Sequence, residues 1–397
     1  MRSFLFLLII PFLILSCDKS SSSDDMTNDE ANDEENIQDT QNLQLDPSFS
    51  DEGIFRYENF YPSTSTISKL QFDNQGRLYA SLISRIMTRL LPNGGLDLSY
   101  GDMGIVMPQS STYALFKEFV VNEDYSLVGV GFPRIRLAKL TPNGYYDGSF
   151  GVNGVADHGD DRGNLNAIAA LSSGGYIVGG RAENNGIEKV TIRKTLPNGQ
   201  RDFTYSDQTV FGESSVSRTF ETASGRIYYN LRKNGAQSST SGILITNPIG
   251  TPIFNVPPDS NQTSNVFALG YYSHPDEEGN IFVLSYNDNT GESKLTKYNN
   301  NGIVQFEVGR RVGNIWRILI DSEQRIIIAS GGIGFAVQRF LPSGELDTTF
   351  GVDGYAEYYF QDEISSEVKD VNLYNDQLYI SGNLSGYPFV ARFLEIE

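Results

Sequence analysis

The chain has 397 residues, which allows roughly two or three average domains or one large repeat protein. Its 39 glycines, 22 tyrosines and 24 phenylalanines stand beside a single tryptophan, a composition that favours many short strands joined by tight turns. The formal net charge of −19 argues against binding to nucleic acid, because an acidic surface repels phosphate. A single cysteine excludes an intramolecular disulfide.

The N-terminus has the form of an export signal. The first three residues carry one positive charge, and residues 4–15 are an apolar run that fits a signal-peptide core but is shorter than the roughly twenty residues of a membrane span. Residues 14–17 read Ile-Leu-Ser-Cys, which resembles the bacterial lipobox, where the cysteine is acylated and becomes the first mature residue. We expect a lipoprotein signal peptide over residues 1–16 and lipid attachment at Cys17. The alternative is an ordinary signal peptide followed by a chance cysteine.

The segment after this cysteine is polar and acidic. Residues 18–40 contain nine Asp or Glu side chains and one Lys, with too little apolar surface to fold. We therefore expect residues 17–42 to form a disordered acidic tether. An acidic run behind a lipidated cysteine also resembles the surface-export signal of Bacteroidetes lipoproteins, and the alternative is a solvated linker. Together these features predict an outer-membrane lipoprotein, attached through Cys17, that faces either the periplasm or the cell surface.

The rest of the chain repeats a turn motif. Each clear copy has Pro-Asn-Gly or Pro-Ser-Gly, followed after two residues by Asp-x-Ser/Thr and an aromatic residue. The clear copies lie at residues 92–100, 142–150, 197–205 and 342–350. Degenerate copies near residues 251 and 304 lack the Asp and the aromatic residue and are assigned by spacing. Self-similarity at this period predicts a repeat architecture.

Each repeat has the pattern of about four short strands. Pro presets φ at the turn, and Asn-Gly accepts the positive φ that closes a hairpin. One such sheet cannot bury both faces alone, so copies must stack, and four-stranded units stack as propellers. We therefore predict an all-β domain over residues 43–397, a seven-bladed β-propeller of about fifty-residue four-stranded repeats.

The two ends of this domain complement each other. Residues 45–49 match residues 346–350, which follow a turn, and residues 391–394 match residues 338–341, which precede one. The first copy therefore starts just after the turn and the last copy stops just before it. We expect the N- and C-terminal strands to share one blade and close the ring.

The repeat resembles a known one. The mark Asp-x-Ser/Thr-Phe-Gly-x-x-Gly after a Pro-Asn-Gly turn is similar to the delta-60 repeat, a bacterial β-propeller repeat, over residues 43–397. Its most specific copies lie around residues 97, 147 and 347. The resemblance implies a propeller fold and an extracytoplasmic setting, and it carries no catalytic residues. Whether the copies near residues 251 and 304 are full blades stays open.

Few residues suggest metal or acid–base chemistry. The chain has two histidines, His158 in a polar loop that we expect to be solvated and His274 before a turn that we expect at the surface. We assign no catalytic residues, and we expect neither a zinc site nor a catalytic triad. Asp73, Asp276 and Asp288 lie in oxygen-rich turns that could hold calcium, although ordinary Asx turns explain them as well. We therefore predict no cofactor, with calcium as the alternative.

Paired aromatic residues are the candidate binding residues. Tyr145 and Tyr146 are adjacent, as are Tyr271 and Tyr272, and in a strand such neighbours face opposite sides, so one of each pair could be exposed. Packing in the core is the alternative. The sequence favours a non-enzymatic binding or scaffold module for a protein or glycan partner. The alternative is a carbohydrate-active or lactone-hydrolysing enzyme with its site in the central channel.

Overall fold

The structure is a computed structural model. It describes residues 43–58, 66–83, 85–109, 114–184, 187–206, 214–233, 241–256, 268–276, 278–287, 292–310, 315–331, 335–360 and 366–395. The chain separates into two units, residues 1–40 and 41–397, so the expected signal peptide, Cys17 and most of the tether fall in the first unit and lie outside the described residues. Every described element is a β-strand. No helix within these ranges is long and apolar enough to cross a membrane.

Five sheets contain four strands each. One consists of β2 (Ile67–Phe72), β3 (Leu78–Leu82), β4 (Ile86–Leu90) and β5 (Ile105–Val106). The next consists of β12 (Ser214–Glu221), β13 (Ile227–Lys233), β14 (Ser241–Thr246) and β15 (Pro252–Val256). Then follow β16 (Ala268–Pro275), β17 (Ile281–Asn287), β18 (Glu292–Tyr298) and β19 (Val304–Arg310), and after them β20 (Ile315–Ile320), β21 (Ile326–Gly331), β22 (Phe335–Phe340) and β23 (Tyr355–Tyr358). The fifth sheet combines β24 (Ser366–Tyr374), β25 (Gln377–Leu384) and β26 (Tyr387–Glu395) with β1 (Ile54–Arg56).

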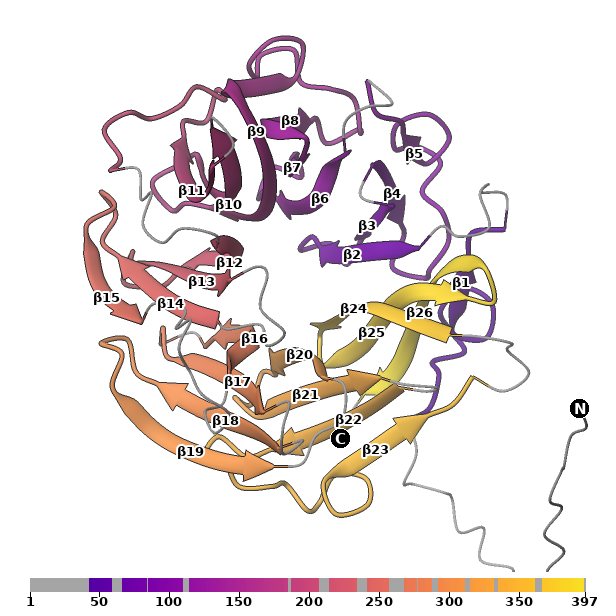
Figure 1. The fold of residues 1–397 in the computed structure, drawn as a ribbon. Coiled ribbons are helices and arrows are strands. Elements are labelled where there is room, and N and C mark those ends of the chain that lie inside the picture. Colours follow the sequence, from indigo (N-terminus) through magenta and orange to yellow (C-terminus); the bar gives the residue numbers. More distant parts are fainter. Residues whose placement is uncertain are drawn as a thin grey trace, which may run out of the picture. The chain divides into compact units, whose positions relative to one another are not determined.

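The sheets follow one another around a common centre, which makes the second unit a β-propeller (Figure 1). The strands nearest the centre are β2, β6, β9, β12, β16, β20 and β24 (Figure 1). Strand β2 contacts β24 on one side and β6 on the other, β20 contacts β16 and β24, and β12 contacts β9. The predicted all-β propeller fold is therefore confirmed.

The prediction of seven separate four-stranded blades is wrong, because only five four-stranded sheets are present among the described residues. A sixth sheet has six strands. It contains β6 (Ala114–Val121), β7 (Leu127–Phe132), β8 (Arg134–Leu140), β9 (Val155–Ala170), β10 (Tyr176–Asn184) and β11 (Ile187–Thr195). The cause is β9, which is 16 residues long. Its first part pairs with β8 and its second part with β10, so two sequence repeats share one strand.

A glycine permits this long strand. A Cβ built on Gly163 would lie 2.2 Å from the Cδ1 atom of Ile135 on β8. A larger residue here would require the Ile135 side chain to shift, whereas glycine leaves room for it. The sequence analysis placed His158 in a polar loop, whereas the structure places it within β9.

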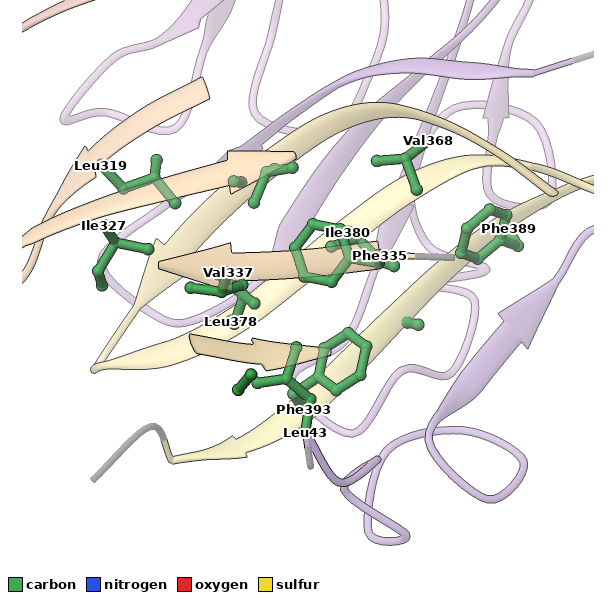
Figure 2. Close-up of a cluster of buried hydrophobic side chains, with 14 of the residues drawn as sticks. Leu43, Leu319, Ile327, Phe335, Val337, Val368, Leu378, Ile380, Phe389 and Phe393 are labelled. Atoms are coloured by element: carbon green, nitrogen blue, oxygen red, sulfur yellow. The ribbon is translucent and has the colours of Figure 1, made fainter. Parts of the chain in front are cut away.

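The predicted closure by both chain ends is confirmed. Strand β1 pairs with β26 in antiparallel register, with Phe55 opposite Val390. Leu43 lies in the same buried cluster as Phe393 and Phe335, which is formed where the sheets of β20–β23 and β24–β26 meet (Figure 2). The ring is thus joined by a sheet that contains both ends of the domain.

The repeated turn glycine touches the neighbouring sheet. Each of these glycines has a positive φ, and a Cβ built on it would lie between 2.5 and 3.2 Å from an aromatic ring of the preceding repeat. The six pairs are Gly94 with Phe49, Gly144 with Tyr100, Gly199 with Phe150, Gly250 with Tyr205, Gly302 with Phe254, and Gly344 with Phe306. The turn and the aromatic residue of the motif are therefore two halves of one contact between neighbouring repeats.

The Asp of the motif supports this aromatic residue. In the clearest copy, Asp347 Oδ1 accepts hydrogen bonds from the amide and the hydroxyl of Thr349, and Oδ2 accepts one from Arg339 Nε at 2.7 Å. The Arg339 guanidinium lies 4.5 Å from the Phe350 ring centroid. Equivalent ion pairs are Arg89–Asp97, Lys139–Asp147, Lys194–Asp202 and Arg392–Asp46. The motif is therefore a structural clamp within each repeat that carries the Asp.

The degenerate copies near residues 251 and 304 are complete sheets, β12–β15 and β16–β19. The sequence analysis found no aromatic residue at the motif position of these copies, but the structure supplies one from elsewhere. Phe254 and Phe306 take its place beneath the next turn glycine, although each lies on an outer strand instead of in the Asp-containing turn.

We predict that Gly344→Ala lowers the unfolding free energy by about 1–3 kcal/mol more than Gly225→Ala does. Both glycines have positive φ, so both substitutions incur about 1 kcal/mol of backbone strain. Only the Gly344 Cβ would meet an aromatic ring, at 2.6 Å from Phe306, whereas the nearest atom to the Gly225 Cβ is 3.8 Å away. Chemical denaturation of the two variants measures the difference, and equal losses would contradict the proposed contact.

We further predict that acid weakens the fold through the Asp residues of the clamp. Burial raises the pKa of Asp347, but hydrogen bonds from Thr349 and Arg339 outweigh burial and hold the pKa below its usual value of 3.8. The stabilisation is therefore complete above that value and is lost as the pH falls through the lower pKa of the folded state.

Asp347→Asn should lower the unfolding free energy near neutral pH by about 3 kcal/mol, because Arg339 keeps its buried charge without the carboxylate. Glu345→Gln, at an exposed position of the same turn, is the matched control and should stay within about 0.5 kcal/mol. Thermal melts from about pH 5 to about pH 2 should also show a shallower decline for Asp347→Asn than for the wild type. An unchanged decline would exclude Asp347 as a contributor.

Candidate functional site

The central channel gathers charged side chains from strands that are far apart in the sequence. Each strand nearest the centre contains an irregularity in its pairing with the next strand. The first residue paired after the irregularity is charged on five of these strands: Lys69 on β2, Glu118 on β6, Arg218 on β12, Arg317 on β20 and Asp370 on β24. It is Ala167 on β9 and Tyr272 on β16. Bulges re-aim side chains, so on the five strands this position brings charges to the channel.

These charges connect neighbouring sheets. Lys69 Nζ on β2 lies 2.8 Å from Glu118 Oε1 on β6, and Arg317 on β20 forms an ion pair with Asp370 on β24. Arg218 on β12 donates a hydrogen bond of 2.8 Å to the backbone carbonyl oxygen of Ser273 on β16. Each contact crosses from one sheet to the next around the centre.

Hydrogen bonds to backbone and side-chain amide groups continue the same belt. Asp370 accepts a hydrogen bond from the backbone amide of Leu70 at 2.8 Å, which joins β24 to β2. Gln71 donates to the Phe119 carbonyl oxygen and accepts from the Val121 amide, which joins β2 to β6. Lys117 on β6 donates to the side-chain oxygen of Asn166 on β9 at 2.6 Å, within the six-stranded sheet. The lining of the channel is therefore a set of contacts that fixes the sheets relative to one another.

Two channel groups have strongly lowered pKa values. Burial, followed by the nearby Arg317 charge, lowers the pKa of Lys69 to about 7, although the Glu118 carboxylate acts in the opposite direction. Burial, followed by the Arg218 charge, lowers the pKa of His274 to about 3. His274 is therefore neutral at physiological pH, and Lys69 is close to half protonated.

The channel contains a cavity of about 240 Å³. Its charged lining consists of Lys69, Arg218 and Arg317 with one carboxylate, Glu118. Hydrolysis of a glycoside by paired carboxyl groups needs two acids that face the same bond. In the described lining, Glu118 is held by Lys69, so the channel offers a cationic wall instead of two converging acids.

Both histidines differ from their predicted places. His158, expected in solvent, is buried, and its Nε2–H donates a hydrogen bond of 3.0 Å to the carbonyl oxygen of Gly199. His274, expected in a surface loop, lies on β16 and lines the channel cavity. Its Nδ1–H donates to the Pro275 carbonyl oxygen at 2.6 Å. The sequence places each histidine beside polar residues or a turn, which does not reveal that a neighbouring strand covers it.

The candidate tyrosines lie in different environments and do not form one site. Tyr145 is 61% exposed, and its hydroxyl donates to the Gly101 carbonyl oxygen at 3.2 Å. Tyr146 is half-buried, and its hydroxyl accepts a hydrogen bond from the amide of Gln109. Tyr271 and Tyr272 belong to β16 by their backbones, and their side chains lie outside the described part. Only Tyr145 is thus described as an exposed aromatic side chain of these two pairs.

The calcium candidates form Asx turns where the structure describes them. Asp73 Oδ1 accepts the amides of Gln75 and Arg77 at 3.0 Å, and Oδ2 accepts Arg77 Nε at 2.7 Å. Asp276 accepts the amide and the side-chain amide of Asn280. Asp288 lies outside the described residues. Within the described ranges, no three His, Cys, Asp or Glu side chains are grouped to hold a metal ion.

Three solved structures share this fold. The polysaccharide lyase Uly1 matches with a TM-score of 0.53 at 10% identity, over 86% of this chain and 92% of that chain. YCF48 bound to a D1 peptide matches with a TM-score of 0.52 at 12% identity, over 89% and 99%. The Dos1 propeller matches with a TM-score of 0.52 at 8% identity, over 87% and 96%. At such identities the similarity shows the β-propeller fold alone. No family model matches the chain, and no curated protein matches its sequence.

We predict that Lys69 makes stability rise with pH above neutrality. Its pKa is about 7 in the folded state and 10.5 in the unfolded chain, so the unfolded chain binds more protons between these values. Each unit of this difference corresponds to about 1.4 kcal/mol. The double variant Lys69→Met with Glu118→Gln should lose the rise without leaving either charge unpaired.

Lys189→Gln, at an exposed position on β11, is the control and should keep the wild-type pH dependence. Thermal melts across this pH window provide the measurement. A double variant with the wild-type slope would show that Lys69 is charged throughout.

Proposed function

We propose that the chain is a cell-envelope lipoprotein whose β-propeller is a non-enzymatic binding module. The proposal comprises a signal peptide over residues 1–16, a lipid anchor at Cys17 in the outer membrane, an acidic tether over residues 17–42 and a binding domain from residue 43 onward. The observation that carries the binding function is the belt of contacts between sheets in the channel. Charges that hold a ring together support a rigid platform, and a rigid platform loses less conformational entropy on binding than a flexible one.

The channel lining supports binding over hydrolysis. Its described carboxylate, Glu118, is engaged by Lys69, and its other charges are cationic. The fold itself is compatible with both kinds of function, since one structural neighbour is a polysaccharide lyase and another binds a peptide. The partner is therefore proposed to be a protein or a glycan held at the surface of the propeller.

A second candidate function follows from the lowered pKa of Lys69. An amine that is about half neutral near pH 7 can accept a proton, and Arg218 and Arg317 in the same cavity can neutralise a carboxylate. This combination suits proton abstraction next to the carboxylate of an acidic sugar. Turnover of an acidic polysaccharide that Lys69→Met abolishes, in a variant that still melts cooperatively, would replace the binding proposal with an enzymatic one.

We predict that photo-cross-linking in the native envelope, from a probe placed beside Tyr145, yields a discrete adduct with one protein or glycan. Tyr145→Ala should abolish the adduct, because this ring is 61% exposed and available to a partner. Phe203→Ala is the matched control, since Phe203 is 80% exposed in the equivalent turn of another repeat. Adducts that are unaffected by Tyr145→Ala would contradict binding at this surface.

Membrane fractionation tests the proposed lipid anchor. Cys17→Ser should move the protein from the membrane fraction to the soluble fraction, because the proposed acyl chains supply the membrane affinity. A Cys17→Ser protein that stays with the membrane would contradict lipidation as the anchor, whatever its cross-links.

A further inference from the structure

The edge strand of one sheet presents two aromatic rings and a carboxylate on the same face. Strand β23 is the outermost strand of the β20–β23 sheet (Figure 1). Ala356 and Tyr358 point to one face, where they join the buried cluster between this sheet and the next. Tyr355, Glu357 and Tyr359 alternate with them and so point to the other face. Because Tyr355 is 36% exposed and Tyr359 is 54% exposed, this Tyr-Glu-Tyr row is accessible from solvent.

The face of this row is covered nearer the centre of the propeller. Tyr355 is directly opposite Gln338 on β22, and Gln338 is directly opposite Ile328 on β21. Directly opposite residues share a face, and Ile328 is buried in one cluster with Phe282 and Leu295 of the preceding sheet. The packing between the two sheets therefore ends before β23, and the Tyr-Glu-Tyr row lies beyond it at the rim.

The two tyrosines hold the carboxylate through one of its oxygens. Tyr355 and Tyr359 each donate a hydrogen bond of 3.0 Å to Glu357 Oε2. Burial, followed by the hydrogen bond to Glu357, raises the pKa of Tyr355 to about 12, and the same carboxylate raises the pKa of Tyr359. Both hydroxyls are therefore donors near neutral pH. Among the described residues, no cation pairs with Glu357 and no donor contacts its Oε1 atom.

The clamps inside the repeats show which group completes such a set. In one clamp, the Ser99 hydroxyl donates to Asp97 Oδ1. The other oxygen of Asp97 pairs with Arg89 at 2.7 Å, and the Arg89 guanidinium lies 4.4 Å from the Tyr100 ring centroid. A hydroxyl thus holds one carboxylate oxygen while an arginine takes the other and covers an aromatic ring. The Tyr-Glu-Tyr row has the hydroxyls, the carboxylate and the rings of this arrangement, but its cation has to come from outside the described residues.

Arginine suits this row better than other cations. A guanidinium is planar, so it stacks on an aromatic ring while its N–H groups donate to a carboxylate. An ammonium group has no flat surface to stack. The net charge of −19 also attracts a basic partner at long range, before the local contact forms.

We propose that the Tyr-Glu-Tyr row is a docking site for an arginine side chain of a protein partner. This inference rests on the proposed binding function and names the chemistry of its partner, at a surface distinct from that of Tyr145. The guanidinium donates to Glu357 Oε1 and lies against the rings of Tyr355 and Tyr359, whose hydroxyls keep the carboxylate in place.

The test is an NMR titration of the full-length protein, isotopically labelled in its tyrosine rings, with N-acetyl-arginine methylamide. The resonances of Tyr355 and Tyr359, assigned from Tyr→Phe variants, should shift in a saturable manner, and the affinity should fall as salt is added. The resonances of Tyr145 and Tyr387, which are also exposed, should not shift. N-acetyl-citrulline methylamide has the same shape without the charge and should bind about fivefold more weakly or not at all.

Variants separate the carboxylate from the rings. Glu357→Gln should weaken arginine binding about fivefold, as expected for an exposed ion pair. Glu123→Gln removes the same charge from an exposed turn between β6 and β7 and should leave binding unchanged. Tyr359→Ala should weaken binding about threefold, whereas Tyr359→Phe keeps the ring and should stay close to the wild type.

Three results would overturn the site: no saturable shift of the two tyrosines, equal binding of the arginine and citrulline probes, or an unchanged affinity in Glu357→Gln. Choline that binds at least as tightly as the arginine probe would overturn the protein partner and assign the row to a lipid headgroup. The cross-linking at Tyr145 probes another surface, so it decides the binding function separately from this site.

Discussion

The whole ring depends on the contact between a turn glycine of one repeat and an aromatic ring of the repeat before it. A single four-stranded sheet cannot bury its own faces, so its stability comes from its neighbours. The turn glycine contributes to this packing in two ways. Its positive φ shapes the turn, and its missing side chain leaves room for the aromatic ring. Next to this contact, the amide of Gly101 donates to the Asn143 carbonyl oxygen at 2.7 Å, which fixes the distance between repeats. The Asp and Arg of the motif then hold the aromatic residue in place from behind.

The turn chemistry of these repeats was predictable from the sequence because it is local. Pro-Asn-Gly and Asp-x-Ser/Thr form their hydrogen bonds within a few residues, so the local amino-acid sequence is enough to identify the turns. Closure by both ends was also predictable, since residues 45–49 and 391–394 complete one another's motif. The aromatic contact near residue 251 was missed because Phe254 reaches the next glycine from an outer strand instead of from the turn. Equivalent contacts can therefore come from residues that a motif search does not align.

The sharing of β9 and the channel belt were not predictable, and the reason is physical. A strand's partners are decided by residues far away in the sequence, and the close approach of Gly163 to Ile135 shows only in three dimensions. The channel charges follow bulges, and a bulge is a mismatch between two strands that neither strand reveals alone. A charged residue at the third or fifth position of a central strand, as at Lys69, Arg218 and Arg317, is a signal that the sequence offered.

The regular repeats and the merged ones hold their charges in different ways. Where the repeats are regular, their charges are engaged in contacts between sheets, as Lys69 is with Glu118 and Arg317 is with Asp370. Where two repeats merge through β9, charges meet inside one sheet. Arg162 on β9 lies opposite Glu183 on β10, and Arg181 on β10 forms an ion pair with Glu188 on β11. Contacts within the six-stranded sheet therefore join these two repeats, whereas the channel belt joins the others across sheet boundaries.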